Sequence, residues 1–559
     1  MDTNMKRRDF LKISALAGVA VVAAACKPAA PTAAPEAEPT KAPEKTEPTK
    51  APEKTEPTAA PEAVGFQGEI EFYAQAYTPT SALENPDPKA PKREAMAIYA
   101  KEWMDLNPGI EFKFHLGAPS GSDWYQWLST QIIGGTGPDC FWIHLSNGNA
   151  YADDGKVVPL NDYLELPNKY TPEDTTPWKM TFKSPFQTTF SPKGQWGAIP
   201  LDLVSTGVYC NVDLFTSVGI DLKKEIVPEL GSPKDWATLI DWCKKIKDAG
   251  YFAFSLSGYI LEWWLQGVLG DQLFWQLTPT FDKLNYHEQR PKQFQEGLVS
   301  QEEVFMQYTC NDWKAFDEPA TRTMFEIFLD LSQYMPDGFV NADTMWSAAW
   351  DLYLQGTLAM FWDGSWRVGA IMQDDRRKFE FSSFWLPPLT KETTEFANDE
   401  PILPIGVGGY GSLAYAIHRK CIEKGNVDAC VDWLMFITTP ERDETIVNEV
   451  PSFIPANKKS KSLPEVENLF VGETRLVAGA GHYWPVPMYW FSADQSKYTD
   501  TFKREMTLYL LGESSMDTFM KNADTAAKEA VPAVLRGAAI QYSDTGSWDL
   551  TRWDCQPTV

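Results

Sequence analysis

The sequence predicts an α/β protein of two lobes, each built on a doubly wound sheet with helices on its faces. Its 559 residues exceed one domain of ordinary size. Hydrophobic residues make up 43% and aromatic residues 13%, which is enough for a sizeable core. Beyond residue 66, strand-like and helix-like segments alternate, and this alternation is typical of parallel sheets whose ligands bind beyond the carboxyl ends of the strands.

The first lobe has the order β-α-β-α-β. Met96, Ala100 and Trp103 share one stripe of a predicted helix that stops at the turn 107–109. Residues 110–116 alternate between apolar and polar, which predicts a strand with one buried face. The expected strands are 68–77, 110–116 and 140–144, and the expected helices are 92–106 and 123–133.

The second lobe begins near Thr206. Ser232 is the expected N-cap of a helix over 233–248, because Pro233 lies in its first turn and Gly250 follows its end. Residues 271–318 are polar and aromatic without a clear period, so we interpret them as an insertion. The other expected strands are 208–211, 252–256, 358–362 and 379–385, and the other expected helices are 321–334, 347–355, 426–437 and 518–530.

The N-terminus reads as an export signal. Residues 6–12 carry a twin-arginine pattern, and an apolar run over 13–25 is too short to span a bilayer. The run ends in small residues followed by Cys26, which resembles the lipobox of bacterial lipoproteins. We expect lipidation of Cys26, and the alternative is soluble release after an Ala-x-Ala site.

Residues 27–65 are expected to form a tether. They consist almost entirely of Pro, Ala, Glu, Thr and Lys, and the nonapeptide at 38–46 recurs at 47–55. Prolines at this density forbid helix and favour extended conformations. A Tat-exported lipoprotein held on the outer face of the cytoplasmic membrane is the resulting prediction.

Charge, cysteines and histidines exclude several functions. The 76 acidic residues against 50 basic ones argue against nucleic acid as a partner. Cys140 and Cys210 lie in apolar strand-like runs and are expected to be buried thiols, whereas Cys421 and Cys430 could pair. The five histidines form no HExxH or Cys/His cluster, so we expect no metal and no cofactor.

Motifs for catalysis are weak. Residues 406–411 satisfy GxGxxG, but a strand-like segment follows them where a dinucleotide site needs a helix. Acidic residues are adjacent at 153–154 and 374–375, and such pairs could serve as general acid and base. In a chain with 76 acidic residues, however, adjacent acids are expected by chance. We therefore expect no enzymatic activity.

Aromatic segments are more informative. Residues 361–367 place Trp362 and Trp366 around a turn that follows a strand. Residues 483–491 include Tyr489 and Trp490 in a proline-stiffened run, and prolines suit a regular core element poorly. Such rings make stacking walls for a ring-shaped ligand, with core packing as the alternative for each.

Several motifs in order resemble family 1 extracellular solute-binding proteins, the sugar-binding group that includes maltose-binding protein. The resemblance covers roughly residues 66–545 and is interrupted by 271–318. The motifs that carry it are GTGPD at 135–139, YADDGKVVPLNDY at 151–163, WGAIP at 196–200, YCNVDLF at 209–215, GTLAM at 356–360, GSW at 364–366, TPE at 439–441 and IPA at 454–456.

The resemblance implies two α/β lobes joined by hinge strands, which close on a solute and pass it to the permease of an ATP-driven importer. It assigns ligand stacking to Trp366 and places Tyr489 and Trp490 in an aromatic wall. Further ligand-binding candidates are Trp142, His144 and Ser146 after the third strand, Gln75 and Tyr77 at the end of the first strand, Asp202 at the crossover, and Trp362.

Taken together, we predict a monomeric carbohydrate-binding lipoprotein of an ABC importer. The alternatives are an exported carbohydrate-active enzyme, or the same fold with a non-sugar solute. The expected divisions are a signal peptide at 1–25, the anchor and tether at 26–65, lobe 1 at 66–203 and 386–440, and lobe 2 at 204–385 and 441–559 with the insertion 271–318. Hinge crossings are expected near 200–207, 385–388 and 439–450.

Overall fold

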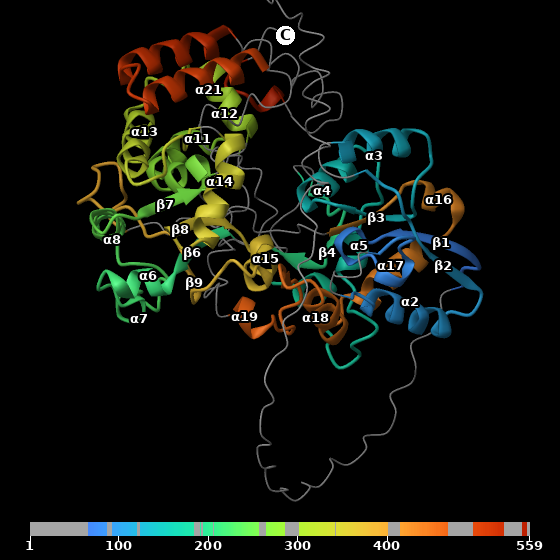
Figure 1. Cartoon of the computed structure of the whole chain (residues 1–559). Helices are drawn as coiled ribbons and strands as arrows, with labels where there is room; N and C mark the ends of the chain where they lie inside the picture. The colour runs from blue at the N-terminus through green and yellow to red at the C-terminus, as the bar shows by residue number, and fades with distance from the viewer. Residues whose placement is uncertain are drawn as a thin grey trace, which may run out of the picture. The chain divides into compact units, whose positions relative to one another are not determined.

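Figure 1 shows the structure of the chain, a computed structural model. The structure describes residues 65–86, 92–119, 123–183, 191, 194–204, 206–256, 264–284, 301–340, 342–400, 414–467, 496–529 and 550–555. Contacts divide the chain after Ala60, and all described residues belong to the second unit, Pro61–Val559. The export signal, Cys26 and nearly all of the tether lie outside the described residues.

Lobe 1 is built on a five-stranded sheet in the order β2-β1-β3-β10-β4. Strand β1 pairs in parallel with both β2 and β3, as the β-α-β-α-β pattern predicts. The strands are β1 (Gly68–Tyr73), β2 (Ile110–Phe114), β3 (Cys140–Ile143), β4 (Ile199–Pro200) and β10 (Ala414–Ile417).

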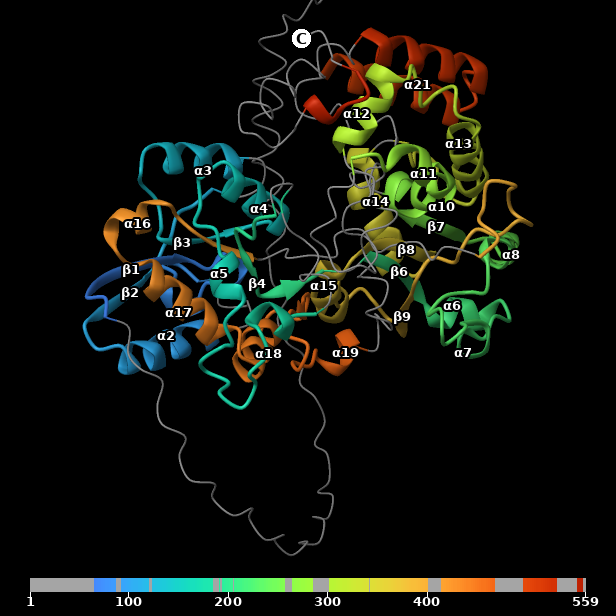
Figure 2. The same cartoon turned by 180° about the vertical axis from the view of Figure 1, so that it is seen from behind.

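Helices cover both faces of this sheet. Figures 1 and 2 show α2 and α17 on one face and α3 and α4 on the other. The helices are α2 (Ala95–Leu106), α3 (Asp123–Ile133), α4 (Leu145–Asp153), α5 (Asn161–Leu164), α16 (Lys420–Lys424), α17 (Val427–Ile437) and α18 (Pro440–Asn448), with 3₁₀ turns η1 (Gln75–Tyr77), η2 (Thr80–Ala82) and η3 (Trp178–Thr181).

Large aromatic rings fill the core of lobe 1. Trp433 of α17 packs against Trp103 of α2 and Phe112 of β2, with ring centroids 5.6 Å and 4.6 Å apart. The Trp103 indole donates to Asp432 at 2.8 Å, so this buried polar group is satisfied. The stripe that predicts helix 92–106 is therefore the face that the helix buries.

The sheet of lobe 1 is not wholly parallel, in contrast to the prediction. Strand β10 runs antiparallel to both β3 and β4, so the chain re-enters the sheet in the opposite direction after passing through lobe 2. Residue patterning gives the position of a strand but carries no direction, because side chains alternate in the same way in both kinds of pairing.

Lobe 2 is built on a four-stranded sheet in the order β7-β8-β6-β9. Strand β8 is parallel to β7, whereas β6 runs antiparallel to β8 and β9, so this sheet is also mixed. The strands are β6 (Thr206–Asn211), β7 (Phe252–Leu256), β8 (Leu358–Gly364) and β9 (Phe381–Phe384).

Lobe 2 is rich in helix. The elements are α6 (Val212–Ser217), α7 (Leu222–Glu225), α8 (Trp236–Asp248), a π-helical turn η6 (Leu265–Gly270), α10 (Asp271–Leu273), η7 (Trp275–Leu277), α11 (Thr278–Phe281), α12 (Gln301–Cys310), α13 (Pro319–Ser332), α14 (Ala342–Leu354), η9 (Ser365–Arg367), α15 (Val368–Gln373), α19 (Pro464–Glu467), α21 (Ser496–Leu510) and η10 (Leu550–Arg552). A further helix runs over residues 516–529.

The segment 271–318 belongs to the core of lobe 2. Within its described residues it forms α10, η7, α11 and α12, and Phe274, Phe281 and Phe305 are buried there. A disulfide joins Cys310 at the end of α12 to Cys555, with 5.4 Å between the two Cα atoms. These helices show no clear period in the sequence, since short elements carry too few turns to show one.

The chain passes between the two cores on a pair of short antiparallel strands, β5 (Asp202–Leu203) and β11 (Ile454–Pro455). Leu201 and Ala456 are buried in the core of lobe 1, whereas Leu203 and Ile454 pack with residues of lobe 2. Each strand thus changes lobe within a few residues, and the first passage lies where the sequence predicts it.

Two domain boundaries differ from the predicted ones. Leu386, Leu389 and Ala397, expected in lobe 1, pack in the core of lobe 2. Ile446 and Val447, expected in lobe 2, pack in the core of lobe 1. Boundaries depend on which core accepts an apolar side chain, and local patterning does not contain that information.

Candidate functional site

Seven ring-bearing side chains gather at one edge of the lobe 1 sheet. We name them the aromatic cluster, which consists of Tyr73, His115, Trp124, Tyr125, Trp127, Trp142 and His144.

Trp124 is the centre of the aromatic cluster and is fully buried. Its ring centroid lies 4.9 Å from Tyr73, 5.1 Å from Trp127 and 5.1 Å from Trp142. His144 then lies edge-on to Trp142 at 5.1 Å. These spacings are those of favourable aromatic pairs, so the rings hold one another in place.

The topology of the sheet explains why these residues meet. Tyr73 ends β1, His115 follows β2, and Trp142 lies near the end of β3. Because the three strands are parallel, their carboxyl ends share one edge of the sheet. Helix α3 contributes Trp124 from its first turn and Trp127 three residues later.

The outer rings of the aromatic cluster keep part of their surface exposed. Tyr73, Tyr125, Trp127 and Trp142 are half-buried, and His144 is exposed. A rigid, partly open set of ring faces offers flat apolar area for stacking. His115 adds a polar group, with its Nδ1 2.8 Å from Oε1 of Glu71.

Gln75 follows the same strand in a strained backbone conformation. Its φ is +54°, a region that residues other than glycine enter rarely. Thr78 donates from its backbone N–H and its Oγ1 to the Gln75 carbonyl, at 3.1 Å and 2.8 Å. The side-chain Oε1 of Gln75 is buried and has no hydrogen-bond partner among the described residues. Strain together with an unpaired acceptor is typical of a binding position.

Tyr77 and Asp202 contact each other. The Tyr77 hydroxyl donates to Oδ2 of Asp202 at 2.6 Å. Both residues are buried, and burial, followed by the charge of Asp202, raises the pKa of Tyr77 well above its ordinary value. The bond links η1 to β5, where the chain leaves lobe 1, so these two candidates, which were predicted separately, lie together at the passage between the cores.

In lobe 2, Trp366 folds back over a glycine. A Cβ atom at Gly364 would lie 2.2 Å from atoms of the Trp366 ring, which only glycine allows. The ring is half-buried, and the Trp366 carbonyl lies 3.4 Å from Oγ of Ser452, near β11. Trp366 therefore occupies an ordered position with part of its surface open.

A buried carboxylate organises this turn. Asp363 accepts from its own neighbour Gly364 N–H at 2.8 Å and from Arg367 Nε at 2.8 Å. Desolvation by burial raises the pKa of Asp363, and Arg367 opposes this rise. The Tyr209 hydroxyl donates to the Gly364 carbonyl at 2.7 Å. Three hydrogen bonds thus fix the conformation of the turn in the absence of a ligand.

The remaining predicted site residues are either buried, without a described side chain, or outside the described residues. Trp362 is 1% exposed and packs in the core of lobe 2, so its ring is not open to a ligand in this structure. Ser146 lies in the first turn of α4, and nothing is described of its side chain. Tyr489, Trp490 and the glycine motif at 406–411 lie outside the described residues.

Each acid pair has one member that is held in an ion pair. Asp154 is paired with Lys156 at 2.6 Å, and Asp374 with Arg376 at 2.8 Å. The hydrogen bond from Arg376 lowers the pKa of Asp374, which is the opposite of what a general acid needs. Across the described ranges, no group of His, Cys, Asp and Glu side chains is arranged to hold a metal ion.

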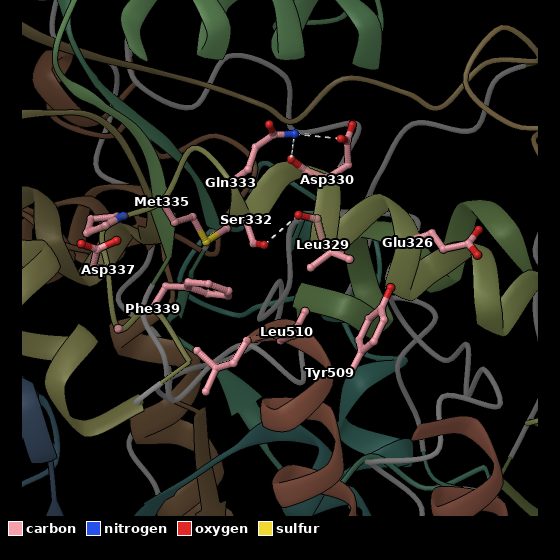
Figure 3. A pocket seen from close by; sticks show the side chains of 13 residues that line it. Glu326, Leu329, Asp330, Ser332, Gln333, Met335, Asp337, Phe339, Tyr509 and Leu510 are labelled. Carbon is pink, nitrogen blue, oxygen red and sulfur yellow. Dashed lines mark hydrogen bonds between the residues drawn. The ribbon is translucent and has the colours of Figure 1, made fainter. Parts of the chain in front are cut away.

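A pocket of about 580 Å³ lies in lobe 2, and Figure 3 shows side chains that line it. It lies between the ends of α13 and α21, where Glu326, Asp330 and Tyr509 line it, and Gln333 Nε2 donates to Asp330 Oδ1 at 2.9 Å. No predicted site residue is among its lining residues. None of the helices in the described part of the chain has the length and apolar character that a membrane-spanning segment requires.

Comparison with protein families decides the assignment. The model of the bacterial extracellular solute-binding proteins matches residues 87–436. The chain belongs to this family. The match includes α3, β3 and the turn at 363–367, hence most of the aromatic cluster and Trp366. A search of curated proteins gives no match.

Solved structures of extracellular solute-binding proteins share the fold. Apo RafE from Streptococcus pneumoniae has a TM-score of 0.55 at 15% identity, covering 83% of this chain and 98% of its own. The sugar-binding protein MalE from Xanthomonas citri has 0.55 at 14%, covering 85% and 99%. The cyclic alpha-maltosyl-1,6-maltose binding protein from Arthrobacter globiformis has 0.50 at 18%, covering 83% and 99%. The predicted two-lobed α/β fold of the family is confirmed.

Some residues of the site in this solute-binding protein are not among the predicted ones. Tyr73, Tyr125 and Trp127 belong to the aromatic cluster and lie close to predicted positions in the structure. The signal was present: Tyr73 lies in a predicted strand beside Gln75, and the helix predicted over 123–133 carries three rings. Placing strand ends of a parallel sheet at a common edge would have brought these rings to Trp142.

Proposed function

We propose that this extracellular solute-binding protein captures a carbohydrate, a mono- or oligosaccharide, between its lobes and delivers it to an ABC importer. The observation that carries this proposal is the aromatic cluster at the carboxyl edge of the lobe 1 sheet. Sugars present flat C–H faces that stack on aromatic rings, and hydroxyl groups that need nearby donors and acceptors.

The proposed contacts come from both lobes. In lobe 1, Trp142, Trp127 and Tyr73 offer ring faces, and the unpaired Oε1 of Gln75 suits a hydroxyl donor. In lobe 2, Trp366 offers a ring held over Gly364. Tyr489 and Trp490 are proposed to extend the wall from the C-terminal region.

Related structures support the choice of a sugar. One neighbour, the RafE protein, is described in complex with raffinose, with a TM-score of 0.52 at 15% identity over 83% of this chain and 99% of its own. Another is named for cyclic alpha-maltosyl-1,6-maltose. At these identities the likeness concerns the fold, so the substrate class of this chain rests on its own rings.

Export and anchoring complete the proposal. The family is extracellular, which implies an exported chain. We propose the Tat route for the signal at 1–25 and lipidation at Cys26. A diacylated or triacylated cysteine anchors stably, because two or more buried chains exceed the marginal affinity of one. The permease of an ABC importer is the proposed protein partner, and the receptor is proposed to act as a monomer.

Calorimetric titration of mono- and oligosaccharides, raffinose and maltose among them, tests the ligand. We expect heat-producing, saturable binding of at least one saccharide, with intact sugar recovered afterwards. Release of a cleaved sugar would favour the rival reading as a carbohydrate-active enzyme. Binding of an amine or peptide with no binding of any saccharide would overturn the carbohydrate assignment and leave the family unaffected.

A substitution at Trp142 tests the site. Truncating an aromatic anchor typically costs about 2–4 kcal/mol of binding, or roughly 30- to 1000-fold in affinity. Trp142→Ala should weaken saccharide binding by that factor. Ile133→Ala is the control, because Ile133 is 85% exposed at the end of α3, the helix that carries Trp124 and Trp127, and should leave affinity unchanged.

Replacing Cys26 tests the anchor. Cys26→Ser removes the sulfur that would carry the lipid, so we expect the protein to move from the membrane fraction to the soluble fraction of fractionated cells. If the variant stays with the membrane to the same extent as the native chain, lipidation at Cys26 is wrong.

A further inference from the structure

Three free thiols meet in the core of lobe 1. Cys140 comes from β3, Cys421 from α16 and Cys430 from α17. Cys430 lies in the middle, and its thiol interacts with those of both other cysteines. Cys421 Sγ also lies 3.6 Å from the carbonyl oxygen of Asp139. We name these three cysteines the thiol cluster.

The thiol cluster is sealed from solvent. All three side chains have no exposed surface. Burial raises the pKa of Cys140 and of Cys430, and the hydrogen bond to Cys430 followed by burial raises that of Cys421. Because the thiolate is the form that attacks a disulfide, these groups are unreactive while lobe 1 is folded.

The cysteines that are paired have the opposite character. Cys310 and Cys555 are both partly exposed and are joined across a sequence separation of 245. They meet only because α12 and the C-terminal segment pack together in lobe 2. The Trp553 indole donates to Oε1 of Glu302 at 2.6 Å, which fixes that segment on α12.

The cysteines that are paired in the folded protein are not the ones that an unfolded chain would pair first. Cys421 and Cys430 lie nine positions apart, so their encounter closes a short loop. The probability of loop closure falls as about the 3/2 power of loop length, which favours Cys421 with Cys430 over Cys310 with Cys555 by roughly a hundredfold. An oxidant that met the unfolded chain would therefore join the neighbours first.

We propose that this chain folds before it is oxidised, so that the Cys310–Cys555 disulfide forms last, in the folded protein, while the thiol cluster stays reduced. The folded structure selects the distant pair by bringing it together at the surface, and it protects the near pair by burial. The oxidant is met outside the cytosol, because the cytosol keeps thiols reduced.

The chemistry is ordinary thiol–disulfide exchange. The thiolate of one surface cysteine, Cys310 or Cys555, attacks the disulfide of oxidised glutathione, which forms a mixed disulfide and releases one glutathione thiolate. The other cysteine then attacks the mixed disulfide and releases the second glutathione. The protein loses two protons and two electrons, and the oxidant becomes two reduced glutathione molecules.

Refolding in two orders tests the proposal. The full chain carrying Cys26→Ser, which leaves seven cysteines, is unfolded in denaturant with a reductant. One half is refolded reduced and then treated with oxidised glutathione, and the other half is oxidised in denaturant and then refolded. Disulfides are mapped by mass spectrometry, and free thiols are counted before and after denaturation.

The two orders should give different maps. Folding first should give the Cys310–Cys555 disulfide alone, with five thiols that a thiol reagent reaches only in denaturant. Oxidation first should give mainly the Cys421–Cys430 disulfide. The protein isolated from its own cell envelope should match the first map.

Two variants test which cysteines form the disulfide in each refolding order. Cys310→Ser/Cys555→Ser should end with no disulfide when folding comes first. Cys430→Ala should lose the dominant product when oxidation comes first. The proposal is overturned if the folded, reduced chain forms the Cys421–Cys430 disulfide, if the chain oxidised in denaturant still gives Cys310–Cys555 alone, or if the envelope protein carries a Cys421–Cys430 disulfide.

Discussion

Two tryptophans four positions apart have opposite environments. Trp362 is buried in the core of lobe 2, and Trp366 is half-buried on a fixed turn. Trp366→Ala should lower saccharide affinity by roughly 30- to 1000-fold and leave the melting temperature of the ligand-free protein within a few degrees. Trp362→Ala should instead cost about 3–5 kcal/mol of unfolding free energy, because it leaves a cavity.

Calorimetric binding and thermal unfolding of both variants separate these outcomes. If Trp366→Ala unfolds much more readily but binds as before, its ring is a core side chain, and the stacking assignment fails.

A second prediction concerns the glycine beneath the ring. Gly364→Ala places a methyl group where the Trp366 ring lies, so the ring must move and affinity should fall by at least tenfold, about 1.4 kcal/mol. In a Trp366→Ala background the same change should cost almost nothing, because the space is already empty. Equal losses in both backgrounds, measured as a double-mutant cycle, would show that the ring does not depend on Gly364.

At the scale of elements, α18 carries a carboxyl group that should make stability depend on pH. Asp443 is fully buried, accepts from the Asn457 backbone N–H at 2.9 Å and lies near Asp202 and Lys183. Burial raises the pKa of Asp443 from 3.8 to about 8, and Asp202 adds to the rise. The folded state therefore holds a proton that the unfolded chain releases.

The sign of the effect follows from this raised pKa. The stabilisation is complete below about pH 4 and is lost as the pH rises towards about 8, at up to about 1.4 kcal/mol per pH unit. Asp443→Asn should remove this slope between pH 5 and 8 in urea unfolding. Asp174→Asn is the control, because hydrogen bonds to Lys459 and Thr176 lower the pKa of Asp174 and place its titration below this range.

Sequence patterns predict the positions of most helices and strands. They do not predict the features that depend on contacts between segments far apart in the sequence. Helix α3 and strand β7 have the predicted bounds, because each shows its period within one segment. Helix α8 starts later than predicted: Asp235 is its N-cap and accepts from Thr238 N–H at 2.9 Å, whereas Ser232 Oγ donates to the Pro233 carbonyl. Several residues in that region can cap a helix, and only the fold selects one.

The candidate site shows the same division. The motif around Trp366 was found from its turn chemistry, which is local. Tyr73 and Trp127 became part of the aromatic cluster only through the pairing of β1 with its neighbours and the packing of α3. The disulfide between Cys310 and Cys555 could not be predicted either, because no local pattern relates residues so far apart in the sequence.

For the whole molecule, the strand pair β5 and β11 predicts a hinge. Few residues separate the two cores on each strand, so small changes in φ and ψ there can move one lobe against the other. Small-angle scattering at saturating saccharide should show a smaller radius of gyration than the ligand-free protein. An unchanged radius with calorimetrically proven saturation would contradict closure.

The return of the chain to lobe 1 has a consequence for synthesis on the ribosome. Strand β10, which lies between β3 and β4, and Trp433 of α17 are translated after the whole sheet of lobe 2. The core of lobe 1 also needs Ala456, and the core of lobe 2 includes Trp553. From Val208 to Ala456, a nascent chain therefore holds two unfinished cores. A stop codon between Ala456 and Trp553 would release a product with a complete first core and an open second one, which makes it a substrate for chaperones and proteases.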